Sequence, residues 1–396
     1  MNENLKKFLR KLRGEKLDGF IVTNPVNIFY LSGFRGVSVT ERESLLIFNP
    51  QPTLITARLY QSEARSLASK SAGWRIKIKI VDERDKIYKF AQELLKKNER
   101  VGFEENDLKY TEYRGFEKVL QPSSSPYLSS SRKRGSDTSQ AKSKDSRFRG
   151  NDRYRILIPT RNLIEEMRAI KTEDEIAKIE KAQIISQKAF EKLIKTVKPG
   201  QTEGEIAERL AKIIKSLGGQ GLAFETIIAS GPNSGLPHHR TGDRKIKNGD
   251  VLLLDFGAYY QNYCADLSRT IFIDKAKDEH KNIYNHVANA QKAAIDKITH
   301  GVKSSHIHNT ANDIFKSGNL HDYFIHGLGH GVGLEVHETP HLRASVDDPL
   351  SESMVFSVEP GLYFPWGGVR IEDLVTIRNG KARVLGKLQE KLVEIV

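Results

Sequence analysis

The stretch VLLLDFGAYYQNYCADLSRTIFI, residues 251–273, decides the fold of the second half of this 396-residue chain. Two runs of apolar residues flank a polar centre, which predicts a strand, a turn and a second strand. The stretch MVFSVEPGLYFPWGGVRIEDLVTI, residues 354–377, repeats the pattern. The likeness of the two hairpins predicts an internally duplicated α+β architecture, in which two halves of helix and hairpin face each other.

Each predicted hairpin carries two acids. Asp255 and Glu359 end the first strands. Asp266 and Glu372 are expected in the middle of the second strands. Taken singly, each is most simply a salt-bridged or strand-end acid. Four carboxylates that approach one another in apolar surroundings repel and need cations. With one imidazole they suit a pair of divalent ions, with Mn²⁺ as first choice and Co²⁺ or Zn²⁺ as alternatives.

A glycine-rich stretch, HGLGHGVGLEVHETPH at residues 326–341, supplies histidines. It ends in the string H-E-x-x-H, which indicates a zinc peptidase only when it lies on a helix. Pro340 inside the string removes a backbone donor, and it pushes Thr339 away from helical dihedrals. The zinc-peptidase interpretation of this string is therefore rejected, and the histidines need another explanation.

The first 120 residues predict a smaller α/β domain. A strand-like run in LDGFIV breaks at Asn24-Pro25. The stretch ESLLIFNPQPTLITAR, residues 43–58, predicts a hairpin with NPQP as its turn. Apolar residues at helical spacing in KIYKFAQELLKKN, residues 86–98, predict a helix.

Residues 121–156 differ in kind from the rest of the chain. Ser, Arg, Lys, Asp and Gly dominate, so the segment is expected to be a disordered basic insertion or linker. Residues 121–155 hold nine Lys and Arg against three Asp. This surplus of positive charge is nearly half of the net charge of +13. A nucleic-acid-binding segment is the alternative, and the scarcity of aromatic residues speaks against it.

Regular patterns return in the predicted catalytic domain, residues 157–396. PTRNLIEEMRAIK, residues 159–171, is expected to be helical. Capping boxes that begin at Thr172 and Thr202 predict the starts of two further helices. EHKNIYNHVANAQKAAIDKI, residues 279–298, predicts another helix ahead of the glycine-rich stretch.

The motifs LLLDFG…CADLSRT, HGLGHGVGLEVHE, VFSVEPGLY and VRIEDLV resemble those of the dinuclear-metal "pita-bread" peptidases, and most closely those of Xaa-Pro aminopeptidases and Xaa-Pro dipeptidases (prolidases). NPVNIFYLSGF extends the resemblance to residues 1–120, because it is similar to the N-terminal domain that these enzymes share with creatinase. The resemblance implies a pita-bread catalytic domain, an internally duplicated antiparallel sheet with helices, behind a smaller creatinase-like domain.

The resemblance also implies a role for each site residue. One metal ion would be chelated by Asp255 and the other by His330 and Glu359, with Asp266 and Glu372 bridging the two. Glu359 would in addition act as general base.

The remaining roles fall on the substrate side. His326 and His337 would donate hydrogen bonds to the peptide and to the tetrahedral intermediate. His238 would contact the substrate, and Arg370 would orient nearby acids beside it. His341 matches no role in the family.

The implied activity is that of an exopeptidase that hydrolyses the Xaa-Pro bond of peptides or dipeptides with a hydroxide bridging two metal ions. The sequence does not separate aminopeptidase from dipeptidase. A methionine aminopeptidase would keep the same ligands but lack the creatinase-like domain. A creatinase-type amidinohydrolase or a non-catalytic peptide-binding module would have lost metal ligands.

The surroundings expected for the protein follow from composition. Its one cysteine, Cys264, excludes an internal disulfide and fits a reducing cytoplasm. The charged N-terminus lacks the apolar core of a signal peptide, and no run reaches the ~18–20 apolar residues of a membrane span. We expect a cytoplasmic enzyme with a proline-containing peptide as substrate, and neither a membrane nor a specific nucleic acid as partner. The family resemblance implies a homodimer.

Overall fold

The computed structural model describes residues 3–36, 42–70, 76–120, 156–387 and 391–396. The chain divides into two compact units, Met1–Met167 and Arg168–Val396. The division falls after the expected start of the catalytic domain at residue 157, because strand β6 (Ile156–Thr160) pairs with β5 (Arg100–Glu104) of the first unit. The disorder predicted for 121–156 concerns residues that, except for Ile156, lie outside the described ones.

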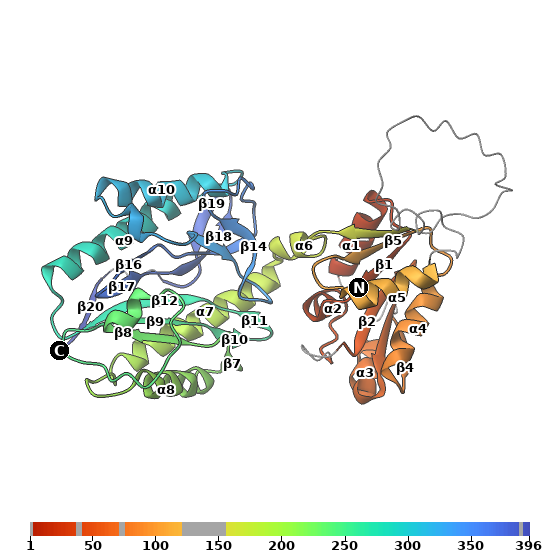
Figure 1. Ribbon diagram of the computed structural model, residues 1–396, viewed down its shortest axis with the longest axis horizontal. Helices are drawn as coiled ribbons and strands as arrows, with labels where there is room; N and C mark the ends of the chain where they lie inside the picture. The colour runs from red at the N-terminus through yellow and green to blue at the C-terminus, as the bar shows by residue number, and fades with distance from the viewer. Residues whose placement is uncertain (1–2, 37–41, 71–75, 121–155, 388–390) are drawn as a thin grey trace, which may run out of the picture. The chain divides into compact units, whose positions relative to one another are not determined.

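A six-stranded sheet in the order β4-β3-β2-β1-β5-β6 forms the first unit (Figure 1). The predicted hairpin is confirmed, because β2 pairs antiparallel with β3. Phe8 packs its ring against Phe20 and Phe48 on one face of the sheet, while α4 and α5 contribute to the core cluster around Ile21 and Ile47. The remaining elements are α1 (Glu3–Gly14), β1 (Gly19–Val22), α2 (Pro25–Ser32), β2 (Ser44–Asn49), β3 (Gln51–Ala57), η1 (Arg58–Tyr60), α3 (Gln61–Lys70), β4 (Lys77–Val81), α4 (Arg84–Leu95) and α5 (Tyr110–Leu120).

The predicted break at Asn24-Pro25 is the start of a helix. Asn24 is the N-cap of α2, and its side chain accepts hydrogen bonds from the backbone of Val26 and Asn27. Pro25 occupies the first helical position, where its missing N–H has no cost. Strand β1 therefore ends at Val22 and the chain turns into a helix at once.

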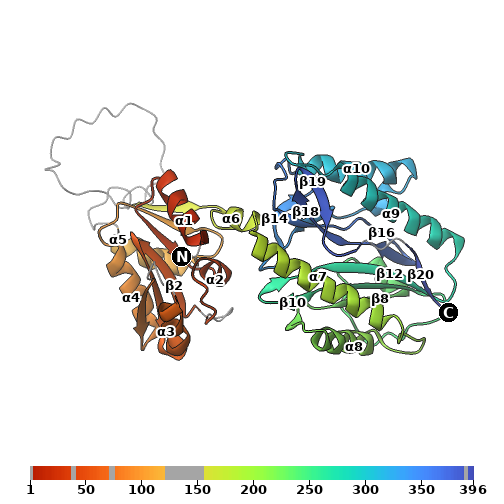
Figure 2. The ribbon, with the colours of Figure 1, turned by 180° about the vertical axis from the view of Figure 1, so that it is seen from behind.

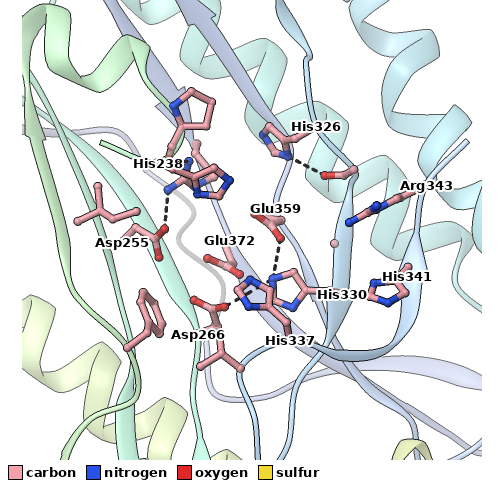
Figure 3. A pocket seen from close by; sticks show the side chains of 17 residues that line it. His238, Asp255, Asp266, His326, His330, His337, His341, Arg343, Glu359 and Glu372 are labelled. Carbon is pink, nitrogen blue, oxygen red and sulfur yellow. Dashed lines mark hydrogen bonds and ion pairs between the residues drawn. The ribbon is translucent and has the colours of Figure 1, made fainter. Parts of the chain in front are cut away.

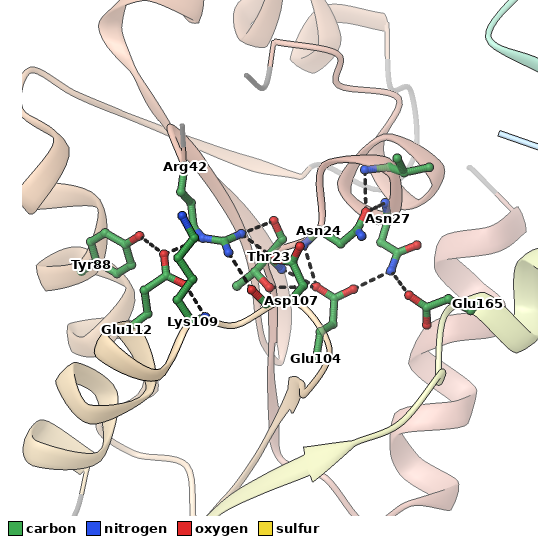
Figure 4. Close-up of polar contacts among 11 residues, drawn as sticks. Thr23, Asn24, Asn27, Arg42, Tyr88, Glu104, Asp107, Lys109, Glu112 and Glu165 are labelled. Atoms are coloured by element: carbon green, nitrogen blue, oxygen red, sulfur yellow. Dashed lines mark hydrogen bonds and ion pairs between the residues drawn. The ribbon is translucent and has the colours of Figure 1, made fainter. Parts of the chain in front are cut away.

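A buried carboxylate joins this turn to β5 (Figure 4). Glu104 accepts hydrogen bonds from the backbone N–H groups of Thr23 and Asn24 and from Asn27 Nδ2. The same Asn27 amide also donates to Glu165 over 2.6 Å. Burial outweighs these donors and raises the pKa of Glu104 to about 7. This first unit thus contains an acid that titrates near neutral pH.

The two larger sheets of the second unit are each covered by a pair of helices, and two smaller sheets, β11-β10-β7 and β16-β17, accompany them among the described residues. The strand orders of the larger sheets are β20-β12-β9-β8 and β14-β13-β15-β18-β19. Helices α7 and α8 share a core cluster with the first sheet, and α9 and α10 share one with the second. Figures 1 and 2 show the strands between the two helix pairs from both sides. The expected duplicated α+β fold is confirmed.

The helices and strands of this unit are as follows in chain order, α6 being the connection from the first unit. They are α6 (Glu165–Ala169), α7 (Glu173–Leu193), α8 (Glu203–Ser216), β7 (Gly221–Leu222), β8 (Ile227–Ser230), η4 (Gly231–Gly235), β9 (Val251–Phe256), β10 (Ala258–Tyr260), β11 (Tyr263–Cys264), β12 (Leu267–Ile273), α9 (Asp278–Lys297), α10 (Ser304–Ser317), η5 (His321–Tyr323), β13 (Gly329–Gly331), β14 (Glu338–Leu342), β15 (Val355–Val358), β16 (Gly361–Phe364), β17 (Gly367–Arg370), β18 (Asp373–Arg378), β19 (Lys381–Val384) and β20 (Val393–Ile395).

The two decisive hairpins are both broken, which the sequence pattern did not predict. In one, β9 pairs with β12 while β10 pairs with β11. In the other, β15 pairs with β18 while β16 pairs with β17. The expected mid-strand positions of Asp266 and Glu372 are therefore wrong, because Asp266 precedes β12 and Glu372 precedes β18. At a break the side chains no longer alternate strictly between the two faces of the sheet. Asp266 and Glu372 both lie at such breaks, and both side chains line the cavity described below.

Helix starts agree better with prediction. Both capping boxes are present, with Thr172 and Thr202 as N-caps of α7 and α8. The helix expected over 159–171 is only α6, because Pro159 and Thr160 belong to β6. Within the described part of the chain, no helix has the length and apolar character needed to cross a membrane.

Candidate metal centre and active site

A cavity of about 310 Å³ in the second unit collects the predicted site residues (Figure 3). All nine line it, although they come from six separate segments of the chain. These residues are His238, Asp255, Asp266, His326, His330, His337, Glu359, Arg370 and Glu372.

The breaks in the hairpins carry the acids to this cavity. Glu359 lies between β15 and β16, and Glu372 lies between β17 and β18. Strand β13 lies so close to β15 that only glycine fits at residue 329. A Cβ on Gly329 would lie only 2.0 Å from the carbonyl oxygen of Ser357. With glycine there, β13 lies against β15, and its next residue, His330, faces the acids.

Three residues have the geometry of a metal-binding group. Ligand atoms of Asp266, His330 and Glu372 all lie within 4.8 Å of one another. His330 Nε2 also lies 3.2 Å from Glu359 Oε1. Asp255 does not belong to this group of three. Its Oδ2 instead accepts a hydrogen bond from Arg370 Nη2 at 2.6 Å.

The electrostatics of the acids fit a site that binds cations. Burial, together with the charges of neighbouring acids, raises the pKa values of Asp255, Asp266 and Glu372. Two buried oxygens, Asp255 Oδ1 and Glu372 Oε1, have no hydrogen-bond partner among the described residues. Unpartnered carboxylate oxygens that repel one another are what a divalent ion compensates. The donor set of four carboxylates and one imidazole therefore fits hard or borderline divalent ions.

His330 and Glu359 form a charge-assisted pair. Burial works against the imidazolium, but the hydrogen bond and charge of Glu359, helped by Asp266, raise the pKa of His330. The same pairing lowers the pKa of Glu359 against the effect of burial. Ser357 Oγ donates a second hydrogen bond to Glu359 Oε1 at 3.1 Å. Glu359 is thus held as a carboxylate.

The other two histidines stay neutral near pH 7. Burial is the main cause that lowers the pKa values of His326 and His337 below the ordinary value. The positive charge of Arg370 lowers the pKa of His326 further, and that of His330 lowers the pKa of His337. His326 Nδ1 donates to Gly327 O at 2.7 Å, so its Nε2 accepts from Tyr363 OH at 3.0 Å. A neutral His326 therefore has no N–H left for a ligand.

The zinc-peptidase string is a strand and not a helix. Glu338 and His341 belong to β14, and His337 directly precedes it. Glu338 lies in a buried ion pair with Arg168 and Lys171 and does not line the cavity. The rejection of the zinc-peptidase interpretation is confirmed.

Arg370 is only 3% exposed and is occupied by protein groups. It donates to Asp255 Oδ2, to Ser268 Oγ at 2.8 Å and to Tyr363 OH at 2.7 Å. Of the roles expected for it, these contacts support the orientation of acids. A substrate contact would have to displace one of them.

Two residues of the cavity wall were not singled out as site residues. His341 lines the cavity with a buried Nδ1 that lacks a hydrogen-bond partner in the described structure. Arg343 lines it with an exposed guanidinium, for which no ion-pair partner occurs among the residues described. The only local signal for either is the sequence PHLR at residues 340–343, which overlaps the end of the misleading string.

A second polar layer lies behind the candidate metal centre, and it was also missed. Gln291 of α9 donates from Nε2 to Val358 O at 3.2 Å, to Ile371 O at 3.4 Å and to Asp373 Oδ2 at 3.0 Å. Val358 precedes Glu359 and Ile371 precedes Glu372. One amide thus ties together the two backbone segments that present these acids.

Comparison with known proteins agrees with the site. The family model "Metallopeptidase family M24" matches residues 177–379, and "Creatinase/Prolidase N-terminal domain" matches residues 4–130. The Xaa-Pro dipeptidase of Pyrococcus furiosus is 33% identical over 394 residues, which are 99% of this chain and 100% of the relative. An uncharacterized peptidase of Bacillus subtilis is 30% identical, with 97% of this chain and 98% of the relative covered.

Solved structures give the same result. The Xaa-Pro dipeptidase from Bacillus anthracis superposes with a TM-score of 0.83 at 29% identity and covers 99% of both chains. An X-Pro aminopeptidase from Thermotoga maritima gives 0.81 at 29% identity, again with 99% of both chains covered. The chain therefore belongs to metallopeptidase family M24, with the pita-bread catalytic domain of the Xaa-Pro peptidases behind a creatinase/prolidase-type N-terminal domain.

Proposed function

We propose that this metallopeptidase hydrolyses the bond before proline, and that its main substrates are Xaa-Pro dipeptides. The observation that carries the proposal is the convergence of four carboxylates and His330 on one cavity, with buried oxygens left without partners. Relatives named Xaa-Pro dipeptidase, which match almost the whole chain at 32–33% identity, support the substrate class.

Two divalent ions, Mn²⁺ in first place, are the proposed cofactors. Asp255 would hold one ion, His330 and Glu359 the other, and Asp266 and Glu372 would bridge both. When bound, such a pair supplies a water of low pKa as nucleophile and a Lewis acid for the scissile carbonyl. The raised pKa values of Asp255, Asp266 and Glu372 support this assignment, because two cations would remove the repulsion among these acids.

The side chains of the chain itself would handle protons and orientation. Glu359, held as a carboxylate by His330 and Ser357, is proposed to accept the proton of the nucleophile and to pass it to the leaving amine. His337 makes no hydrogen bond through its ring among the described residues, so it can donate to the developing oxyanion. His326 is proposed to form the wall of the substrate site and to fix Tyr363 rather than to donate itself.

The preference for dipeptides rests on Arg343. A dipeptide carries its terminal carboxylate directly on the proline, one residue from the scissile bond. An unpaired guanidinium on the cavity wall matches a carboxylate in charge and in planar geometry. His341 lines the same cavity and would add a second contact through the exposed part of its ring. Longer peptides, as taken by aminopeptidases, would leave Arg343 without this partner.

An activity panel tests the proposal. The metal-free protein is loaded with Mn²⁺, Co²⁺ or Zn²⁺ and offered Ala-Pro, Ala-Pro-Ala and Met-Ala-Ser. Metal-dependent cleavage of Ala-Pro, with the highest kcat/KM of the three, is expected. Absence of metal-dependent cleavage of both proline substrates would refute the function. Preference for Ala-Pro-Ala would make the protein an aminopeptidase, and preference for Met-Ala-Ser would favour a methionine aminopeptidase.

A further inference from the structure

A single buried carboxylate organises the loop that brings His238 to the cavity. Glu203, the first residue of α8, is fully buried. Its two oxygens accept five hydrogen bonds, all from the segment between the end of β8 and residue 242. The donors are Ser230 N at 2.8 Å, Ser230 Oγ at 2.7 Å, Asn233 Nδ2 at 2.9 Å, His239 Nε2 at 2.8 Å and Gly242 N at 3.3 Å.

Helix capping does not require this carboxylate. Thr202 and Glu205 already form the capping box of α8, with both reciprocal hydrogen bonds present. Burial alone would raise the pKa of Glu203, but the hydrogen bonds from Ser230, His239 and Asn233 outweigh it and lower the pKa. A carboxylate that stays ionised while buried holds its donors strongly. Its position therefore serves the loop and not the helix.

Adjacent histidines of this loop face different surroundings. His238 lines the cavity, where Figure 3 shows it on the same side as Asp255. His239 instead donates to Glu203 Oε2 and is largely buried, with 13% of its side chain exposed. Because the two residues share a peptide unit, fixing the ring of His239 limits where the ring of His238 can lie.

The opposite face of the loop rests on the hairpin β16–β17 through close backbone contacts. A Cβ on Gly368 would lie 2.1 Å from Ser234 O, and one on Gly235 would lie 2.4 Å from Phe364 O. Gly368 N donates to Ser234 Oγ at 2.9 Å, and Arg370 Nη1 donates to Pro237 O at 3.3 Å. The loop is thus held between Glu203 on one side and the hairpin next to the metal centre on the other.

We infer that Glu203 and His239 are positioning residues for His238, which set the imidazole against the substrate before binding. The inference rests on the proposed peptidase function for its substrate. The two adjacent histidines have different partners: His238 contacts the substrate, and His239 contacts Glu203 of the protein. Loss of the Glu203–His239 contact would leave the metal centre intact and misplace only the substrate-side imidazole.

A double-mutant cycle tests this. His239→Phe is expected to lower kcat/KM for Ala-Pro by about 10- to 100-fold, since small misplacements of a binding group have effects of this size. His238→Ala should cause a loss of similar size. In the His238→Ala background, His239→Phe should then cost less than about twofold, because interacting residues are not additive. His239→Gln, which keeps an amide donor for Glu203, should recover most of the rate.

The control is Glu205→Gln, which alters an exposed acid in the same first turn of α8 and is expected to change stability without changing kcat/KM. Mn²⁺ content should be equal in all variants. Independent losses that multiply in the double variant would overturn the inference, as would an unchanged rate in His238→Ala or a loss of metal in His239→Phe.

A second readout separates this inference from the proposed function. The imidazole NMR signals of His238, assigned by their absence in His238→Ala, should shift and broaden in His239→Phe and in Glu203→Gln, while those of His337 should not. This measurement needs no turnover. If the wild-type protein cleaves no proline peptide but His238 still responds in this way, the proposed function fails and the positioning holds. An unchanged His238 signal refutes the positioning whatever the activity.

Discussion

Arg370 Nη2 donates to Asp255 Oδ2 over 2.6 Å, while Oδ1 of the same carboxylate is buried and has no partner in the described structure. The arginine therefore fixes one oxygen and leaves the other for a cation. Lysine at this position would keep the charge but lose the parallel contacts with Ser268 and Tyr363.

For Arg370→Lys we expect kcat/KM to fall about 10- to 100-fold, with weaker Mn²⁺ binding measured by titration calorimetry. The matched control is Arg378→Lys, which changes a partly exposed ion pair with Glu173 and should leave both quantities unchanged. Wild-type Mn²⁺ affinity and rate in Arg370→Lys would show that Asp255 needs no fixed orientation.

Asp266→Asn is expected to lower the number of bound ions from two to one or none, measured by elemental analysis. Without metal, the substitution is expected not to lower the stability of the protein. Asp266 is buried among other acids whose charges raise its pKa, so the neutral amide removes repulsion. The metal-free variant should therefore unfold at the same or a higher temperature than the metal-free wild type. Two retained ions together with full activity would contradict the bridging role of Asp266.

Much of the fold could be predicted because its signals are local. The capping boxes at Thr172 and Thr202, the hairpin over 43–58 and the end of the strand-like run at Asn24-Pro25 each depend on a few neighbouring residues, and all are present. The acids proposed as metal ligands could also be picked out from the sequence, because acids in apolar strands are conspicuous.

The breaks in the two hairpins could not be predicted in the same way. Each acid lies inside a second strand-like run of the sequence, so Asp266 and Glu372 were expected in the middle of strands. At the break the two arms of the hairpin approach so closely that a side chain would clash with the opposite backbone. A Cβ on Gly257, for example, would lie 1.8 Å from Ala265 O.

The residues that support the site were missed for a related reason. Gln291 has the pattern of any polar residue on a helix, and Glu203 that of any acid in a first turn. Their roles depend on partners 27 to 82 positions away, such as Ser230 for Glu203 and Asp373 for Gln291. Such pairings become visible only when the chain is folded.

Gln291→Leu is expected to loosen the metal centre without unfolding the protein. The variant loses the amide that joins the carbonyl groups of Val358 and Ile371, so Glu359 and Glu372 are held less firmly. We expect about 10-fold weaker Mn²⁺ binding by calorimetry, in line with losses at other supporting residues of metal sites. Lys292→Leu, next to it on the exposed side of α9, is the control. Unchanged Mn²⁺ affinity in Gln291→Leu would refute the role.

Arg343→Met is expected to separate dipeptides from longer peptides. The KM for Ala-Pro should rise about 10- to 100-fold, the range for a lost charge-assisted contact of roughly 1.5–3 kcal/mol. The KM for Ala-Pro-Ala should change less than about threefold, because its carboxylate lies one residue further away. Arg240→Met, an exposed arginine that does not line the cavity, is the control. Equal effects on both substrates would remove the argument for a dipeptidase.

The stability of the first unit should depend on pH through Glu104. Burial raises its folded-state pKa from 4.5 to about 7, so between these pH values the folded state keeps a proton that the unfolded state has lost. Stability from this group is then fully present below about pH 4.5, falls as the pH rises toward 7 and is constant above, with a total loss of at most about 3 kcal/mol. Hydrogen exchange of the backbone amides of Thr23, Asn24, Val26 and Asn27, corrected for intrinsic rates, should report this loss in the intact protein. Glu104→Gln should abolish the pH dependence, while Glu105→Gln, an exposed neighbour, should keep it.

Protection that rises with pH in the wild type would mean that the hydrogen bonds from Thr23, Asn24 and Asn27 outweigh burial and that Glu104 is an ordinary ionised acid.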